Sequence, residues 1–299
     1  MRQLGLIVTC SLLWFAGAGL AWGESIELKD GDRVVWLGGA FVERMQASEF
    51  VETAITAGYP NRRITFRNLG WSGDTVFGEA RAVFGSAEDG FRRLLKDTTE
   101  AKPTVLLIAY GANEAHAGEA GLEHFTQGLN RLLDELAKTE ARMILLLPRG
   151  YEQADEPLPS PTEYNAKLQL YRARLAEVAK QRELPTIDLQ QLSPVDERLT
   201  NNGVHLTPDG YKTLAPRLAA ALGATPISDF ARLEPMRQAI QKKNELYFHR
   251  YRPQNETYLF LFRKHEQGNN AVEIPQFDPL VQEQEDRIAE FRESLTTGS

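Results

Sequence analysis

Short apolar runs alternate with longer amphipathic stretches along most of this chain. Runs rich in Val, Ile and Leu predict strands, and they cover residues 33–37, 63–68, 104–109, 143–147 and 185–189. Three of these runs are almost continuously apolar, which is typical of strands that are buried on both faces of a sheet. The pattern therefore predicts a five-stranded sheet with both faces covered.

Helical periodicity fills the gaps between these runs. Apolar residues recur at spacings of three and four between residues 122 and 136, and again between residues 164 and 178. Thr207 and Pro208 predict the start of a helix that continues to about Leu222, because Thr caps a helix and Pro fits its first turn. Alternating strands and helices predict an α/β fold with a parallel sheet and helices on both faces.

The alternation stops after residue 225. A helix is expected over residues 227–251, followed by a polar and aromatic segment over residues 253–275. Asp278 and Pro279 predict the start of a last helix, with an apolar face formed by Val281, Ile288, Phe291 and Leu295. We expect three parts, which are a signal peptide (1–23), an α/β domain (24–225) and a C-terminal helical extension (226–299).

The N-terminus has the pattern of an export signal. Arg2 precedes an uncharged apolar run, residues 4–20, and the small residues Ala21 and Gly23 flank a cleavage point before Glu24. An uncleaved membrane anchor is the rival interpretation, but the run is short for a span and polar chain follows at once. We expect an exported, periplasmic protein with no membrane attachment after cleavage.

Composition narrows the function further. The single cysteine, Cys10, lies inside the signal segment, so the processed chain would have no disulfide. A lipoprotein anchor at Cys10 is disfavoured because Val8 and Thr9 precede it instead of small residues. The formal charge of -7 and the pI of about 5.4, without a basic stripe, argue against nucleic acid as a partner. No metal or other cofactor is expected, because the histidines lack ligand spacing, and they are His116, His124, His205, His249 and His265.

Polar and glycine-rich segments follow three of the predicted strands directly. They are residues 38–40, 70–74 and 111–114. In a parallel sheet, ligands bind beyond the carboxyl ends of the strands. The sequence therefore predicts that these segments line one cleft at a single edge of the sheet.

Four segments together resemble the blocks of the SGNH hydrolases, or GDSL esterases, in order and spacing. They read LGGA at 37–40, NLGWSGDT at 68–75, YGANE at 110–114 and NGVH at 202–205. The resemblance covers roughly residues 31–222 and is closest in the second block. It implies a flavodoxin-like three-layer fold and ester hydrolysis by a serine that a histidine activates and an aspartate orients.

The resemblance assigns roles position by position. Gly73 and Asn113 correspond to oxyanion donors, and His205 corresponds to the general base. Ala40 stands where the family has its nucleophilic serine, and Asn202 stands where it has the orienting aspartate. A methyl group cannot attack a carbonyl, and a neutral amide cannot stabilise an imidazolium ion by charge. Taken singly, Gly73 suits a turn, Asn113 a helix N-cap and His205 a hydrogen-bonded histidine.

Other side chains could compensate for the missing groups. Glu43 could accept a substrate hydroxyl or pair with Arg44. Glu43 or Asp74 could also assist a direct attack by water, with His205 as the base. We therefore expect Glu43 and Asp74 to contact substrate. Turn or capping roles are favoured for the nearby hydroxyl side chains, Ser72, Thr75 and Thr207.

The segment from 244 to 270 interleaves aromatic residues with His, Arg, Asn and Glu. Such a mixture suits sugar rings and hydroxyls, or a carboxylate bound by arginine. One interpretation is a lid over the cleft in which His265 and Glu266 supply an acid–base pair and His265 contacts substrate. The other is a helical hairpin that packs on the sheet domain with the aromatic residues as its core.

Three functions follow from these observations. The resemblance implies hydrolysis of a small-molecule or carbohydrate ester, above all O-deacetylation of a carbohydrate, by residual or rerouted chemistry because the serine and aspartate are absent. A non-catalytic protein that binds a carbohydrate or acyl ligand in the inherited cleft is the alternative. A structural role, in which the C-terminal helices dock a protein partner, would be favoured by an exposed apolar stripe on the last helix.

Overall fold

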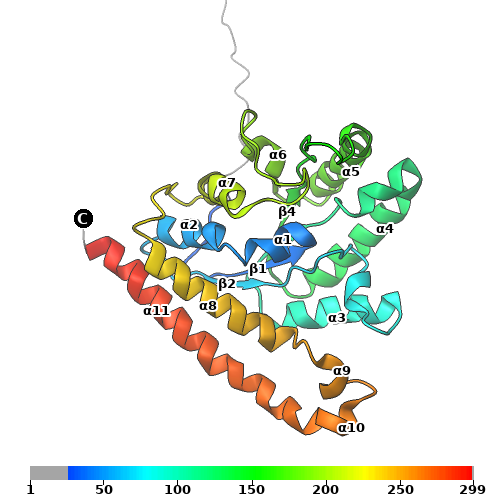
Figure 1. The fold of residues 1–299 in the computed structure, drawn as a ribbon. Helices are drawn as coiled ribbons and strands as arrows, with labels where there is room; N and C mark the ends of the chain where they lie inside the picture. Colours follow the sequence, from blue (N-terminus) through cyan, green and yellow to red (C-terminus); the bar gives the residue numbers. More distant parts are fainter. Residues whose placement is uncertain (1–25, 298–299) are drawn as a thin grey trace, which may run out of the picture.

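The computed structural model describes residues 26–297, and the expected signal segment with Cys10 lies outside these residues. Within the described chain, a five-stranded sheet has the order β2-β1-β3-β4-β5 (Figure 1). Every neighbouring pair is parallel, so the predicted α/β fold is confirmed. The strands are β1 (Arg33–Gly38), β2 (Thr65–Asn68), β3 (Val105–Ala109), β4 (Arg142–Leu147) and β5 (Thr186–Asp188).

Helices cover both faces of the sheet. Side chains alternate between the faces along each strand, so Val34 and Trp36 of β1 enter one core and Val35 and Leu37 enter the other. The first face is covered by α1 (Ala40–Met45), α2 (Phe50–Gly58), α6 (Leu189–Leu192) and α7 (Pro208–Ala221), and the second by α3 (Ala87–Glu100), α4 (Gly118–Ala137) and α5 (Thr162–Gln181). The 3₁₀ turns η1 (Glu79–Arg81) and η2 (Glu114–Ala117) lie beside the carboxyl ends of the strands.

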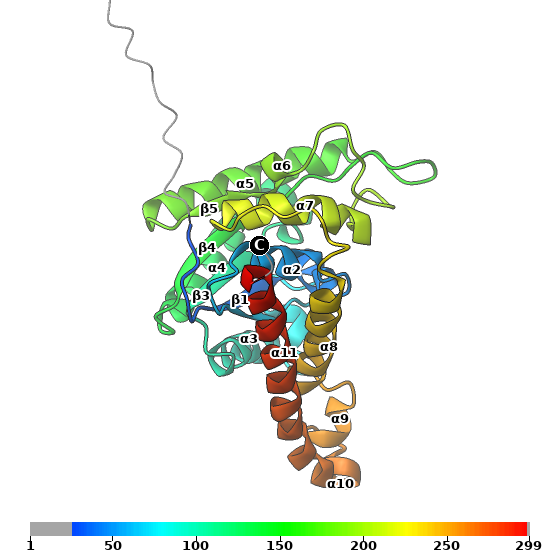
Figure 2. The same ribbon diagram turned by 90° about the vertical axis from the view of Figure 1, so that its left-hand side faces the viewer.

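The C-terminal extension is a pair of long helices, α8 (Glu234–Tyr251) and α11 (Phe277–Thr297). They run side by side in opposite directions (Figures 1 and 2). Helix α8 begins later than the pattern predicts, with Pro235 in its first turn. The link between the pair consists of the short elements α9 (Glu256–Leu259), α10 (Lys264–Gln267) and η3 (Gly268–Gln276).

The helix pair packs along β2, which is an edge strand of the sheet. Lys243 of α8 is fully buried, pairs with Glu52 of α2, and donates a hydrogen bond to the carbonyl oxygen of Phe66 on β2 (3.3 Å). Arg67 of β2 forms a 2.5 Å ion pair with Glu285 of α11. The extension thereby shields the unpaired backbone of an edge strand.

The apolar face of α11 packs inward. Val281 and Ile288 are buried, and Phe291 and Leu295 pack against the core from partly buried positions. The exposed stripe that would have favoured a docking role for the last helix is therefore not formed by these four residues.

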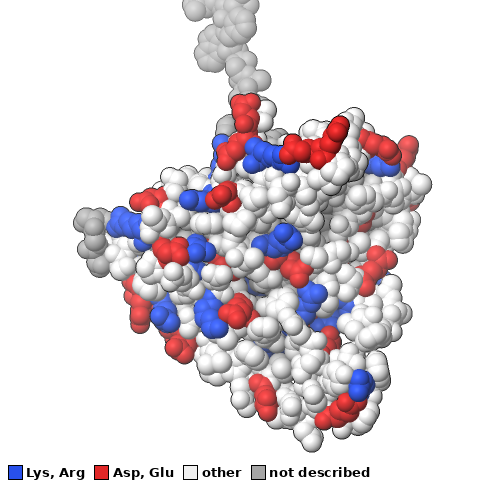
Figure 3. Space-filling view, viewed as in Figure 1, with Lys and Arg blue, Asp and Glu red and all other residues white. Residues whose placement is uncertain are grey.

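Charge is evenly mixed over the face of the molecule that carries the strand ends. Lys and Arg alternate with Asp and Glu there instead of gathering by sign (Figure 3). Between residues 26 and 297, no helix is long and apolar enough to cross a membrane. The same residues contain no group of three or more His, Cys, Asp or Glu that could hold a metal ion.

Candidate active site

A cleft of about 330 Å³ opens at the carboxyl ends of the strands. The structure brings all four sequence blocks to its walls, and the first three lie there as their positions after predicted strands indicate. Each block contributes lining residues, namely Gly39 and Ala40 from the first, Ser72, Gly73 and Asp74 from the second, Ala112 and Asn113 from the third, and Val204 and His205 from the fourth.

Close backbone contacts position the first two blocks. Gly38 has φ +158°, and a Cβ there would lie 2.6 Å from the carbonyl oxygen of Ala109, so the chain can turn directly from β1 into α1. A Cβ on Gly70 would lie 2.2 Å from the backbone nitrogen of Glu43. The second block therefore rests on the backbone of α1, the helix that Ala40 begins.

Glu43 holds the second block in place. Its Oε2 accepts a hydrogen bond from the backbone N–H of Ser72 (2.5 Å), and its Oε1 accepts one from Arg252 at the end of α8 (2.7 Å). The alternative pairing with Arg44 is not formed. Glu43 is not among the residues that line the cleft, so it positions the loop that carries Gly73 instead of facing a ligand.

The carboxylate of Asp74 is likewise engaged within the protein. Its side chain is fully buried, and Oδ2 accepts hydrogen bonds from Nε of Arg81 (2.7 Å) and the hydroxyl of Tyr110 (2.8 Å). Asp74 is among the residues that line the cleft, and contact between its carboxylate and a substrate stays a prediction. Its backbone carbonyl oxygen accepts a hydrogen bond from Nδ2 of Asn113 (2.7 Å), and Asn113 makes no side-chain capping bond at η2.

Glu114 ties the second and third blocks together. Its two carboxylate oxygens accept hydrogen bonds from the backbone N–H groups of Val76 (2.9 Å) and Gly111 (2.8 Å). Burial raises its pKa to about 7. Glu114 also lines the cleft, and its two hydrogen bonds join the loops on both sides.

The pair formed by Asn202 and His205 determines what the histidine can do. Oδ1 of Asn202 accepts hydrogen bonds from the backbone N–H groups of Val204 (3.1 Å) and His205 (2.8 Å). Its Nδ2, 3.0 Å from Nδ1 of His205, is then the donor, and Nδ1 is the acceptor. Since a neutral imidazole carries one proton, that proton must be on Nε2.

Electrostatics keep this imidazole neutral. Burial lowers the pKa of His205 below its ordinary value, and the nearby Arg44 lowers it further. Arg44 is exposed at the cleft and makes no ion pair with any carboxylate of residues 26–297. A neutral ring with its proton on Nε2 donates a hydrogen bond, whereas a general base would need an unprotonated Nε2.

The sequence analysis missed several cleft residues, among them Arg149 and Tyr151. Arg149 and Tyr151 follow β4 directly and line the cleft, so the position after a strand that revealed the first three blocks could have revealed them too. The ring of Tyr151 stacks on Tyr164 with centroids 3.7 Å apart. Arg149 pairs with Glu152, while its buried Nε and Nη1 have no hydrogen-bond partner in the described chain.

His265 lies elsewhere. It belongs to α10, its side chain is 74% exposed, and its Nε2 is 3.7 Å from Glu266. The α9–α10 segment instead faces α3, where Glu256 pairs with Arg93 at 2.6 Å. The expected lid and acid–base pair are therefore not formed over the cleft, and the extension packs as a helical hairpin.

Comparison with known proteins agrees with the fold and with the resemblance of the four blocks. The model of the GDSL-like lipase/acylhydrolase family matches residues 38–213. No curated protein matches the sequence. Among solved structures, an acetylxylan esterase from Geobacillus stearothermophilus is similar, with 18% identity, a TM-score of 0.52, and coverage of 68% of this chain and 99% of that one.

Two further structures show the same likeness. A catalytic mutant of that esterase, in which a serine is replaced with alanine, has 18% identity and a TM-score of 0.52 over 67% of this chain and 98% of that one. A gut microbial diltiazem-metabolizing enzyme has 21% identity and a TM-score of 0.52 over 67% of this chain. This chain spans 48% of the length of that enzyme. At these identities the likeness establishes the fold.

Proposed function

Because this chain belongs to the GDSL-like lipase/acylhydrolase family, we propose that its cleft binds a carbohydrate ester or other acyl ligand without cleaving it. The hydrogen bond from Nδ2 of Asn202 to Nδ1 of His205 carries this proposal. Acyl transfer needs a nucleophile and a base. Ala40 supplies no nucleophile, and the bonded amide leaves His205 as a hydrogen-bond donor.

The remaining groups suit an ester carbonyl. The backbone N–H of Gly73, the second N–H of Asn113 Nδ2 and the Nε2–H of His205 are all donors on residues that line the cleft. Donors that would stabilise an oxyanion also hydrogen-bond a neutral carbonyl oxygen. An ester or acyl group can therefore be held in the inherited orientation even though no attack follows.

Two observations support a carbohydrate ester. The cleft volume of about 330 Å³ lies within the range of small-molecule sites, and the ring of Tyr151 on its wall offers an apolar surface to a sugar. The similar esterase is described as acting on acetylated xylan. An acetylated xylo-oligosaccharide is accordingly the first ligand to test.

Rerouted hydrolysis by water is less well supported. It needs a base inside the cleft, yet the carboxylate of Glu43 is bonded to Ser72 and Arg252. Asp74 is bonded to Arg81 and Tyr110. Each of these carboxylates is already paired with an arginine.

Acetate release from an acetylated xylo-oligosaccharide tests the absence of hydrolysis. We expect no release above background by the wild-type chain, and little by Ala40→Ser alone, because His205 would still carry its proton on Nε2. Ala40→Ser combined with Asn202→Asp should be far more active, since the corresponding Asp-to-Asn exchange in a serine protease lowers kcat by about 10⁴. Wild-type turnover that disappears in His205→Ala would overturn the proposal.

Ligand binding is tested separately by calorimetry with the same oligosaccharide. We expect saturable binding that weakens about tenfold in His205→Ala, which corresponds to the loss of one hydrogen bond. His124→Ala is the matched control, because His124 stacks on Phe77 and does not line the cleft. No saturable binding, or equal weakening in both variants, would contradict binding in this cleft.

We also propose that the chain is exported, on the pattern of residues 1–23. Expression of the full chain and N-terminal sequencing of the exported fraction test this. The expected first residue is Glu24. A chain that keeps its N-terminus and stays in the membrane fraction would support the anchor interpretation instead.

A further inference from the structure

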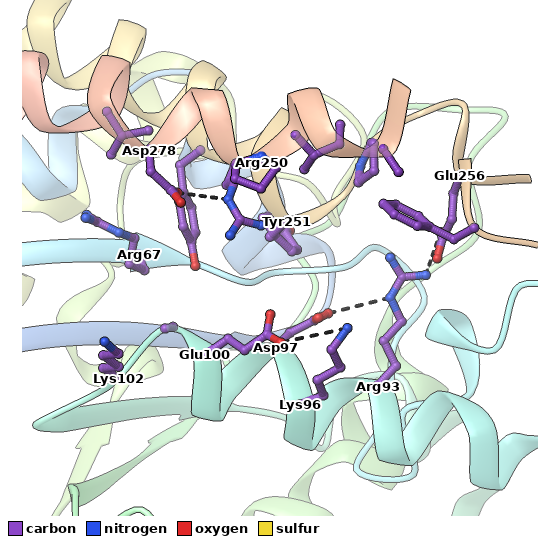
Figure 4. A pocket seen from close by; sticks show the side chains of 18 of the residues that line it. Arg67, Arg93, Lys96, Asp97, Glu100, Lys102, Arg250, Tyr251, Glu256 and Asp278 are labelled. Atoms are coloured by element: carbon purple, nitrogen blue, oxygen red, sulfur yellow. Dashed lines mark hydrogen bonds and ion pairs between the residues drawn. The ribbon is translucent and has the colours of Figure 1, made fainter. Parts of the chain in front are cut away.

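A second cavity separates the C-terminal extension from the sheet domain. Its volume is about 1000 Å³. Figure 4 shows side chains of α3, among them Arg93, Lys96 and Asp97, facing Arg250 and Asp278 of the helix pair across this space. None of its lining residues lines the cleft, so the two sites are distinct. We call this space the basic cavity.

Positive charge predominates among the residues that line the basic cavity. Seven of them are Lys or Arg and four are Asp or Glu. Some cations have a partner: Arg250 pairs with Asp278 at 2.8 Å, and Arg93 pairs with both Glu256 (2.6 Å) and Asp97 (3.6 Å). This concentration contrasts with the negative charge of the chain as a whole.

Two cations remain without a carboxylate partner. Within residues 26–297, neither Arg33 nor Lys102 forms an ion pair or a side-chain hydrogen bond, although both line the basic cavity. Arg67 stands opposite Val35 in the sheet, so it lies on the same face as Arg33. Burial and then Arg67 lower the pKa of the Arg33 guanidinium, whereas Glu285 raises it. A carboxylate or sulfate placed here would pair with this guanidinium.

We propose that the basic cavity binds an acidic oligosaccharide, a short sugar chain that carries carboxylate or sulfate groups. Arg33 and Lys102 would bind the anionic group. The binding site is built by the extension together with α3 and the strands β1 and β2.

The other lining groups favour a sugar over a bare inorganic anion. The carboxylates of Glu100 and Asp278 would repel a compact polyanion, but they accept hydrogen bonds from hydroxyl groups. Phe260, which is 46% exposed, offers a ring face to the apolar side of a sugar. The volume is at the upper end of the range for small-ligand sites, which suits more than one sugar unit.

Calorimetry on the chain without its signal segment tests this inference with three matched probes. They are a trisaccharide of galacturonic acid, a sulfated galactose trisaccharide and neutral galactotriose. We expect saturable binding of at least one acidic probe, and the preferred probe identifies the anionic group. Binding of the neutral probe should be at least about tenfold weaker, because charge-assisted hydrogen bonds are lost.

Two variants locate the binding site. Arg33→Gln and Lys102→Gln should each weaken binding of the acidic probe about tenfold. Lys180→Gln is the matched control, because this exposed lysine of α5 is outside the basic cavity. Circular dichroism confirms that each variant is folded.

Several outcomes would overturn the proposal. These are absence of saturable binding by both acidic probes, equal binding of the neutral probe, or equal weakening by Lys180→Gln. Binding that is lost in His205→Ala but kept in Lys102→Gln would place the acidic sugar in the cleft instead.

Discussion

At the scale of single residues, the position of the proton on the His205 imidazole tests whether this ring donates a hydrogen bond into the cleft. We expect ¹⁵N NMR of the imidazole to show a protonated Nε2 and an accepting Nδ1, because Asn202 donates to Nδ1. Asn202→Asp should move the proton to Nδ1 and raise the pKa of His205 by about one unit or more, since a carboxylate stabilises the imidazolium ion. A wild-type ring with its proton on Nδ1 would contradict the assignment.

The close backbone contact at Gly70 leads to a second prediction at the residue scale. A Cβ there would lie 2.2 Å from the backbone nitrogen of Glu43 and 2.7 Å from its Cα. Gly70→Ala should therefore lower the free energy of unfolding by about 2 kcal/mol or more, because a backbone segment must move.

Gly31→Ala is the control for Gly70→Ala. Gly31 has φ +80°, and nothing lies within 4 Å of a Cβ built on it, so only the conformational cost of about 1 kcal/mol is expected. Denaturant unfolding measures both variants. Equal losses would mean that the contact between the second block and α1 is easily relaxed.

At the scale of elements, docking of α8 depends on a buried charge. Lys243 is fully buried against Glu52, so Lys243→Met leaves a buried carboxylate without its cation. We expect a loss of about 3–5 kcal/mol in the free energy of unfolding. The neighbouring Lys242 is 53% exposed and pairs with Glu245, so Lys242→Met should change stability by less than about 0.5 kcal/mol. Similar losses in both variants would refute this role for Lys243.

Elements with a clear period were predictable from the sequence. The strands and the helices over residues 122–136 and 164–178 correspond to β1–β5, α4 and α5. The expected helix over residues 227–251 begins only at Glu234, because Ile227 and Phe230 pack against the core from a non-helical connection. Apolar residues in such a connection are indistinguishable by composition from the first turns of a helix.

The same limit applies to the candidate site. The positions of three blocks directly after strands predict that they meet at one edge of the sheet. The pairing of Glu43 with Arg252 does not follow, because the two residues are 209 positions apart along the chain. Sequence shows which groups are charged, but the pairing of distant charges depends on how the extension packs.

At the scale of the whole molecule, several buried carboxyl groups determine how stability responds to pH. Burial raises the pKa of Glu49, Glu52, Asp97 and Glu114, with Asp97 at about 6 and Glu114 at about 7. The folded state then binds more protons than the unfolded state above the ordinary carboxyl pKa. Such groups favour folding at low pH, and this contribution is lost as the pH rises through their folded pKa values.

We therefore expect the unfolding midpoint to fall between about pH 5 and pH 7.5. Glu114 alone would account for about 2 kcal/mol of this change. His205 acts in the opposite direction, because its lowered pKa favours folding as the pH rises towards neutrality. Thermal unfolding as a function of pH measures the sum, and Glu114→Gln should flatten the slope. A midpoint that rises over this range would contradict the expectation.

The hydrogen bonds of Glu43 limit how this chain can change during evolution. One carboxylate joins Ser72, in the cleft, to Arg252, in the extension, although the family match ends at residue 213. The two regions are thus not independent modules that can be exchanged between relatives. Replacing the extension without position 43 would leave a carboxylate without its cation, so positions 43 and 252 should be inherited as a pair.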